Sequence, residues 1–190
     1  MELKGSQTEK NILTAFAGEA QARNRYDYFA KVAKKEGYEQ IADVFARTAL
    51  QEKEHAKRLF KFLEGGDVEI TASYPAGKIG ATLENLYAAA EGENYEHTVM
   101  YPEFAKVAEE EGFTEIAAVM RNIAVAERAH EQTYRKLADN INGGRVFKKD
   151  GKVWWQCRNC GYMIEAAQAP LKCPACAHPQ SYFEMMADNF

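Results

Sequence analysis

The chain has 190 residues, of which 46% are hydrophobic and 27% are charged, a composition typical of a folded globular protein with one sizeable core. Its formal net charge of −4 and the absence of a Lys/Arg cluster argue against nucleic acid or an anionic membrane as a partner. No long apolar run and no apolar segment at the N-terminus occur, so we expect a cytoplasmic protein without a membrane span.

Apolar residues recur every three or four positions over residues 8–63, which predicts two amphipathic helices separated near residues 36–38. Residues 64–82 contain four glycines and one proline and lose this period, so they predict a long connection. A third helix is expected from about residue 83, and a fourth over residues 114–141.

An internal repeat relates the two halves of this helical region. The segment YFAKVAKKEGYEQIA at 28–42 matches EFAKVAEEEGFTEIA at 103–117, an offset of 75. Upstream the offset is 74, which predicts one extra residue near Tyr101 and Pro102, as a bulge or kink at the proline. Two related helix pairs joined by a long crossover predict a mainly α protein, with a ferritin-like four-helix bundle over residues 1–144.

Polar residues interrupt the apolar faces that this bundle would bury. Four glutamates and two histidines share these faces: Glu19, Glu52, His55, Glu93, Glu127 and His130. Each histidine follows a glutamate by three residues, about 60° around the helix. A Glu from each of two helices plus Glu-x-x-His from the other two is the ligand set of a carboxylate-bridged dinuclear site, and these donors suit iron or manganese.

Glu96 lies one helical turn beyond Glu93 on the same face, and its counterpart in the first half is Ala22. The minimal site does not need a fifth carboxylate. The spacing therefore leaves two interpretations of Glu96 open, an additional ligand or a solvated charge between helices.

Tyr26 and Tyr101 lie about two turns beyond Glu19 and Glu93, and we expect them either to donate hydrogen bonds to ligand carboxylates or to be ordinary core tyrosines. We expect His97 at the surface or behind a ligand, rather than as a ligand. Three glutamates fall outside the ligand face and are expected to be solvated: Glu54, Glu91 and Glu131.

The last 40 residues differ in composition and contain all four cysteines: Cys157, Cys160, Cys173 and Cys176. β-prone residues at 153–155 precede these two Cys-x-x-Cys pairs, so we expect a small β-rich module over residues 145–190. Four thiolates in tetrahedral geometry suit a structural zinc ion or a single iron, and a redox site in the same chain favours iron. No cysteine is left for a disulfide elsewhere, as is usual in intracellular metal proteins.

The chain is similar to the rubrerythrin family in AFAGEAQARNRY, QEKEHAKRLFKFLEGG, AEGENYEHTVMYPEFA, AERAHE and the rubredoxin-like CRNCGY…CPACAHP. The resemblance covers nearly the whole chain and implies a non-haem diiron site with the ligands Glu19, Glu52, His55, Glu93, Glu96, Glu127 and His130. It also implies one iron held by the four cysteines and a peroxidase that protects against oxidative stress. Members are typically homodimers in which the thiolate iron of one subunit lies near the diiron site of the other.

Reduction of hydrogen peroxide to water needs two electrons and two protons. A ferrous pair can deliver both electrons, and the thiolate iron would replace them singly. The resemblance implies that Glu96 and His55 exchange on one iron, and a metal-bound carboxylic acid oriented by Tyr26 or Tyr101 would supply the proton. Because no Gly-x-Gly-x-x-Gly motif follows a strand, we expect an external protein donor, a flavoprotein reductase or a rubredoxin.

Two other activities fit the predicted bundle, a ferroxidase that handles iron and an oxygenase that activates dioxygen. The four-cysteine module argues against iron storage, which needs no thiolate relay. The extra carboxylate and the lack of an evident substrate insertion argue against an oxygenase. In a third interpretation the module is a zinc ribbon that serves only for docking.

Overall fold

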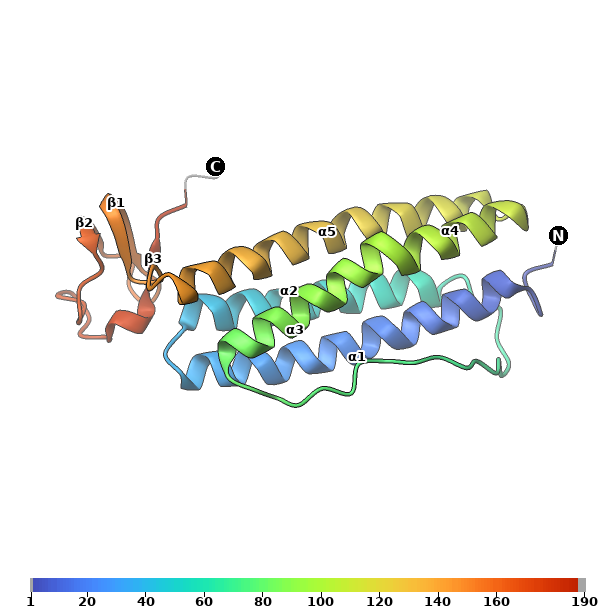
Figure 1. The fold of residues 1–190 in the computed structure, drawn as a ribbon, viewed down its shortest axis with the longest axis horizontal. Coiled ribbons are helices and arrows are strands. Elements are labelled where there is room, and N and C mark those ends of the chain that lie inside the picture. The colour runs from blue at the N-terminus through green and yellow to red at the C-terminus, as the bar shows by residue number, and fades with distance from the viewer. Residues whose placement is uncertain (1, 188–190) are drawn as a thin grey trace.

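The computed structural model describes residues 2–187. Its helices have the bounds α1 Gln7–Lys35, α2 Glu39–Phe60, α3 Thr82–Tyr95, η1 Glu96–Met100, α4 Tyr101–Glu110 and α5 Thr114–Asn142. The short element η1 is a π-helix that joins α3 to α4 without a break, so these three form one long helix of the bundle (Figure 1). The expected mainly helical, ferritin-like four-helix bundle is confirmed.

One long connection carries the chain from the first helix pair to the second. Residues 61–81 form no helix or strand and run beside α1 along the length of the bundle (Figure 1). The Tyr74 hydroxyl donates to the backbone carbonyl of Thr14 on α1 at 2.8 Å. This crossover makes α2 and α3 parallel, so α1 and α3, the matching helices of the repeat, run in opposite directions (Figure 1).

Local signals set the ends of the helices. The Ser6 side chain caps α1 by accepting a hydrogen bond from the backbone N–H of Glu9 at 3.0 Å. In the turn between the two helices of each pair, Gly37 and Gly112 adopt φ of 85° and 82°, a left-handed conformation that other residues rarely take.

The two halves also cap each other. Glu111, which ends α4, accepts hydrogen bonds from the backbone N–H and the hydroxyl of Thr8 at the start of α1. Its repeat counterpart Glu36 accepts from the backbone N–H of Thr82 at the start of α3, at 3.0 Å. Carboxylates at helix N-termini satisfy free N–H groups and favourably face the helix dipole.

The core consists of two apolar clusters separated along the bundle axis by a polar layer. Along α1, Ile12 belongs to one cluster and Phe29 to the other, and Glu19 lies between them. The second cluster contains a group of aromatic side chains in mutual contact, with Phe45 and Tyr134 at 5.0 Å between ring centroids.

The extra residue in the second half lies in η1. The backbone N–H of Tyr101 donates to the carbonyl of Glu96, five residues earlier, so the wider π turn accommodates the additional residue. This position precedes Tyr101, whereas the sequence suggested a bulge at Pro102. Because of the insertion, Tyr101 is buried eight residues after Glu93, as Tyr26 is buried seven residues after Glu19.

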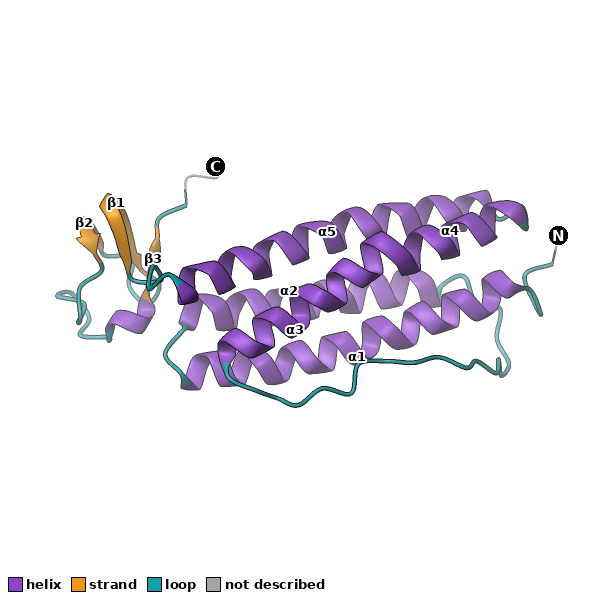
Figure 2. Cartoon of the chain, viewed as in Figure 1, coloured by secondary structure: helices purple, strands orange, loops and turns teal. Residues whose placement is uncertain are grey.

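The C-terminal part is a small antiparallel sheet with strand order β2-β1-β3, formed by β1 Lys148–Cys157, β2 Met163–Gln168 and β3 Phe183–Met185 (Figure 2). Trp155 and Phe183 are buried in its own core. The sheet lies at the end of the bundle where α1 turns into α2, and Arg158 pairs with Asp43 of α2 at 3.0 Å. Tyr38 stacks on Phe147 at the same junction.

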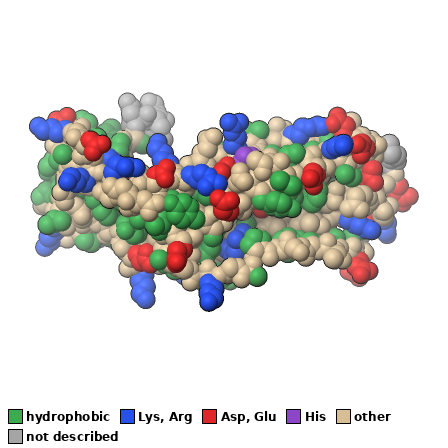
Figure 3. Space-filling model, viewed as in Figure 1, with side chains coloured by type: hydrophobic (Ala, Val, Ile, Leu, Met, Phe, Trp, Pro, Cys, Tyr) green, Lys and Arg blue, Asp and Glu red, His purple; other side chains and the backbone are tan. Residues whose placement is uncertain are grey.

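The surface gives no sign of a single dominant charge on the face seen in Figure 3, where Lys/Arg and Asp/Glu side chains are interspersed. Within residues 2–187, none of the helices combines the length and the apolar character needed to cross a membrane.

Candidate metal centres

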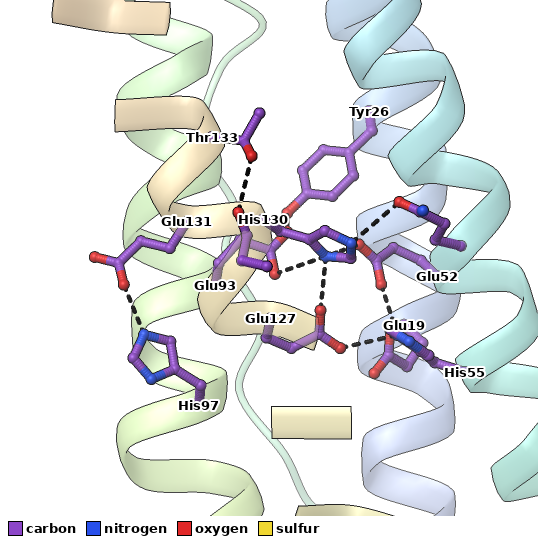
Figure 4. A network of polar contacts seen from close by, with 12 residues as sticks. Glu19, Tyr26, Glu52, His55, Glu93, His97, Glu127, His130, Glu131 and Thr133 are labelled. Atoms are coloured by element: carbon purple, nitrogen blue, oxygen red, sulfur yellow. Dashed lines mark hydrogen bonds and ion pairs between the residues drawn. The ribbon is translucent and has the colours of Figure 1, made fainter. Parts of the chain in front are cut away.

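The polar layer of the bundle draws side chains from all four long helices (Figure 4). Its carboxylates and imidazoles are Glu19 from α1, Glu52 and His55 from α2, Glu93 from α3, and Glu127 and His130 from α5. The four carboxylates are at most 1% exposed. Ionised carboxylates removed from water to this extent need a cation or a proton close by.

These six side chains form two overlapping groups. Glu19, Glu52, His55 and Glu127 offer ligand atoms within 4.8 Å of one another, and so do Glu52, Glu93, Glu127 and His130. Glu52 and Glu127 belong to both groups. The arrangement therefore has two adjacent positions for a cation, with two carboxylates between them.

The shared carboxylates face both positions at once. The two oxygens of Glu127 lie 2.8 Å from the Nδ1 atoms of His55 and of His130, one oxygen to each ring. The two oxygens of Glu52 also face different rings, with Oε2 at 3.0 Å from His55 Nδ1 and Oε1 at 3.2 Å from His130 Nδ1. A carboxylate that directs one oxygen to each position is suited to bridge two ions.

Many of these atoms are close together and yet are not hydrogen-bonded. Among residues 2–187, buried atoms without a hydrogen-bond partner include Glu19 Oε2, Glu52 Oε1, Glu93 Oε2, both oxygens of Glu127 and His130 Nδ1. Their lone pairs converge on shared positions rather than on each other. Buried polar groups are normally satisfied, so the donor set fits two bound metal ions with oxygen and nitrogen ligands.

In the metal-free protein, protons must replace the missing cations. Burial and the neighbouring carboxylates Glu52 and Glu127 raise the pKa of Glu93 to about 8. Burial, and then Glu127, raise the pKa of Glu19 well above its usual value. Burial would lower the pKa of His130, but its contacts with Glu127 and Glu52 outweigh this and raise it to about 12. Metal binding must therefore displace protons.

Two buried tyrosines hold the outer carboxylates. The hydroxyl of Tyr26 donates to Glu93, and that of Tyr101 donates to Glu19, so each half of the repeat supports a glutamate of the other half. Burial, followed by the adjacent carboxylate, raises the pKa of both phenols well above 10. Both tyrosines therefore remain hydrogen-bond donors, the first of the two interpretations that the sequence left open.

Glu96 lies beside this layer but belongs to neither group of ligand atoms. It is 8% exposed, and burial, followed by the charges of Glu19 and Glu93, raises its pKa well above the usual value. It begins the π-helix, a segment with wider turns than an α-helix. The interpretation of Glu96 as a solvated charge is wrong.

A second network joins η1 to α5 outside the ligand layer. His97 Nε2 lies 2.6 Å from an oxygen of Glu131 (Figure 4). The other oxygen of Glu131 lies 2.6 Å from Arg135 Nε. The expectation that Glu131 is solvated is wrong, because its side chain is only 13% exposed and bonded on both sides. Glu91 and Glu54 are exposed, as expected, in pairs with Arg135 and Lys57.

Gln51 is a residue near the ligands that the sequence analysis did not select. Its Oε1 atom lies 3.1 Å from His130 Nε2, on the side of the ring opposite the carboxylates. A comparison of the two halves of the repeat could have pointed to Gln51, because the residue that matches it at the offset of 75 is Ala126.

The four cysteines form a separate cluster in the β module. Cys157 and Cys176, and likewise Cys160 and Cys173, have their sulfurs 3.7 Å apart, and all four lie within 4.8 Å of one another. A tetrahedron with metal–sulfur bonds of about 2.3 Å has edges of about 3.8 Å, so the four thiolates fit one metal ion. They are free cysteines rather than disulfides.

The two cysteine loops are built alike. In each, the first cysteine's carbonyl accepts from the backbone N–H four residues later, at Gly161 and Ala177, and both of these residues have positive φ. Glycine adopts this conformation freely, whereas alanine is strained there.

Comparison with known proteins gives two family matches. Residues 10–138 match the model of the rubrerythrin family, and residues 155–184 match that of the rubrerythrin rubredoxin-like domain. A rubrerythrin of Porphyromonas gingivalis is 64% identical over 99% of this chain and 94% of its own length. A rubrerythrin of Nitratidesulfovibrio vulgaris is 61% identical over 99% of this chain and 98% of its own length.

Solved structures show the same fold. The fully reduced, all-ferrous state of nigerythrin superposes with a TM-score of 0.64 at 31% identity, over 97% of this chain and 91% of that one. Mycobacterium tuberculosis bacterioferritin BfrA also reaches a TM-score of 0.64, but at 17% identity and over 75% of this chain, a likeness of fold alone. The four-helix architecture is therefore common to this chain and these proteins.

Proposed function

The chain belongs to the rubrerythrin family, and on that premise we propose that it is a non-haem diiron peroxidase that reduces hydrogen peroxide to water. One observation carries the proposal. Glu52 and Glu127 each direct one oxygen to either side of the layer, which suits two ions at adjacent positions. Two ferrous ions held there would supply together the two electrons that cleavage of the O–O bond consumes.

The protein's own groups would hold the ions, exclude water and manage protons. We assign Glu19, Glu52, His55, Glu93, Glu96, Glu127 and His130 as ligands. Tyr26 and Tyr101 would keep the outer carboxylates in place by donating to them, and would orient a carboxylic acid that gives its proton to the leaving oxygen. By family resemblance, Glu96 and His55 would alternate as ligands of one iron.

The four-cysteine module would serve as the electron entry point. Cys157, Cys160, Cys173 and Cys176 would hold one iron that supplies electrons singly, although the sulfur spacing fits zinc equally well. We further propose a homodimer in which this module approaches the bundle of the partner subunit. The electrons would come from a separate protein, a rubredoxin or a flavoprotein reductase.

A single anaerobic mixing experiment tests this function. The fully reduced protein is mixed with stoichiometric hydrogen peroxide, and the visible ferric-thiolate absorption is followed over time, with air-saturated buffer as the comparison. Fast return of colour with peroxide and much slower return with air is expected. Equal or faster return with air would favour a ferroxidase or an oxygenase, and a colourless metal-loaded protein would identify the module as a zinc ribbon.

Glu96→Ala provides a matched variant for the same experiment. Its side chain lies beside the ligand groups, and its repeat counterpart is Ala22, so the first half already tolerates alanine at this place. We expect slower peroxide turnover in the variant. An unchanged rate would contradict the role assigned to Glu96.

A further inference from the structure

The two histidines of the ligand layer differ in what contacts the far side of the ring. His130 Nε2 lies 3.1 Å from the side-chain oxygen of Gln51 on α2. No hydrogen bond to Nε2 of His55 is found within residues 2–187. Both rings otherwise have equivalent surroundings, since each directs Nδ1 at Glu52 and Glu127.

The internal repeat explains this difference. Gln51 precedes Glu52 by one residue, and the residue that precedes Glu127 is Ala126. A methyl group accepts no hydrogen bond, so α5 offers His55 nothing equivalent to what α2 offers His130. The asymmetry is therefore a property of the sequence, expressed between helices whose other ligands are matched.

The chemistry of a metal-bound imidazole determines the direction of the hydrogen bond. His130 Nδ1 lies 2.8 Å from Glu127, 3.2 Å from Glu52 and 3.6 Å from Glu93, so Nδ1 is the atom available to a metal. A ring that binds a metal through Nδ1 has its proton on Nε2. This N–H donates to the carbonyl oxygen of Gln51, and the amide orientation follows from the same requirement.

We propose that Gln51 is a positioning residue that fixes His130 as a permanent ligand, and that Ala126 leaves His55 free to turn. The inference rests on the proposed two-metal centre. Rotation of the His130 ring away from the layer would break its hydrogen bond to Gln51, whereas rotation of His55 breaks no bond at Nε2. The side chain of His55 is also 18% exposed against 12% for His130. The ring of His130 is thus restrained at Nε2, and the ring of His55 is not.

Proton exchange at Nε2 measures this directly, without any turnover. The protein is labelled with 15N-histidine and loaded with Zn²⁺, which is diamagnetic and redox-inert. The chain has only four histidines, so their Nε2–H signals are readily assigned by substitution. We expect slow exchange with solvent for His130 and fast exchange for His55.

Three variants separate positioning from folding. Gln51→Ala removes the acceptor and should accelerate exchange at His130 by about three- to tenfold, as loss of one hydrogen bond implies. Gln51→Glu keeps an acceptor oxygen and should restore slow exchange. Ala126→Gln gives His55 the missing acceptor and should slow its exchange, while leaving His130 unchanged.

Unchanged exchange at His130 in Gln51→Ala, or equally slow exchange of both rings in the parent protein, would overturn the inference. If Gln51→Ala does not fold, Ala126→Gln tests it independently, and a failure to slow His55 counts against it. Failure of the parent bundle to bind two zinc ions would instead contradict the proposed metal centre. The two failures are therefore distinguishable.

Discussion

Replacement of Glu93 by glutamine should affect the metal-free and the metal-loaded protein in opposite ways. In the metal-free protein, burial and the nearby carboxylates raise the pKa of Glu93 from 4.5 to about 8. Between these values the folded state binds a proton that the unfolded state has lost. The stability contributed by this group is therefore complete below pH 4.5 and decreases as the pH rises toward 8.

At pH 7 the magnitude follows from the interval of about 2.5 pH units between the usual pKa of 4.5 and pH 7, because the folded-state pKa of about 8 lies above this pH. Each unit corresponds to about 1.4 kcal/mol, so the penalty at pH 7 is about 3 kcal/mol. A neutral glutamine still accepts the hydrogen bond from Tyr26 and avoids this penalty. We expect Glu93→Gln to stabilise the chelator-treated protein at pH 7 by about 1 to 3 kcal/mol and to flatten its pH dependence.

The metal-loaded protein should respond in the other direction, because a charged ligand is lost and less binding free energy is available to the folded state. Urea denaturation at pH 5, 6, 7 and 8, with chelator and with ferrous iron under argon, measures both effects. Glu91→Gln is the matched control, since Glu91 lies on the same helix and its side chain is 66% exposed. Destabilisation of the metal-free protein by Glu93→Gln, with an unchanged pH slope, would refute the reasoning.

Three further substitutions test other parts of the structure. Glu111→Gln should lower the free energy of unfolding by about 0.5 to 1 kcal/mol at pH 7. Because the hydrogen bond from Thr8 lowers the pKa of Glu111, this difference should vanish as the pH falls and the carboxylate is protonated. Urea titrations at pH 7 and 3.5 measure it. Gly161→Ala should destabilise the β module by about 1 to 2 kcal/mol, and Ala177→Gly should not, as judged by chelator-induced unfolding. His97→Ala should lower the free energy of unfolding by about 1 to 2 kcal/mol and accelerate amide hydrogen exchange in η1, because it removes the contact between this segment and Glu131. Unaltered amide exchange in η1 would contradict the role given to this contact.

Much of the fold and most of the ligand layer were accessible from the sequence, because both depend on periodicity. Helical spacing assigns Glu52 and His55 to one face, and the offset of 75 transfers the same pattern to Glu127 and His130. The two Cys-x-x-Cys pairs are equally local signals. The sequence alone therefore predicted two related helix pairs with matching ligands, and a separate four-cysteine site.

The remaining features depend on which side chains meet across helices, and that is decided by packing. The contact between Gln51 and His130 joins residues 79 positions apart, and no spacing rule selects it. The π turn in η1 shifts Tyr101 by a fraction of a helical turn, enough to direct its hydroxyl at Glu19. Periodicity reports the direction of a side chain from its own helix, whereas only the tertiary structure determines what it reaches on the next one.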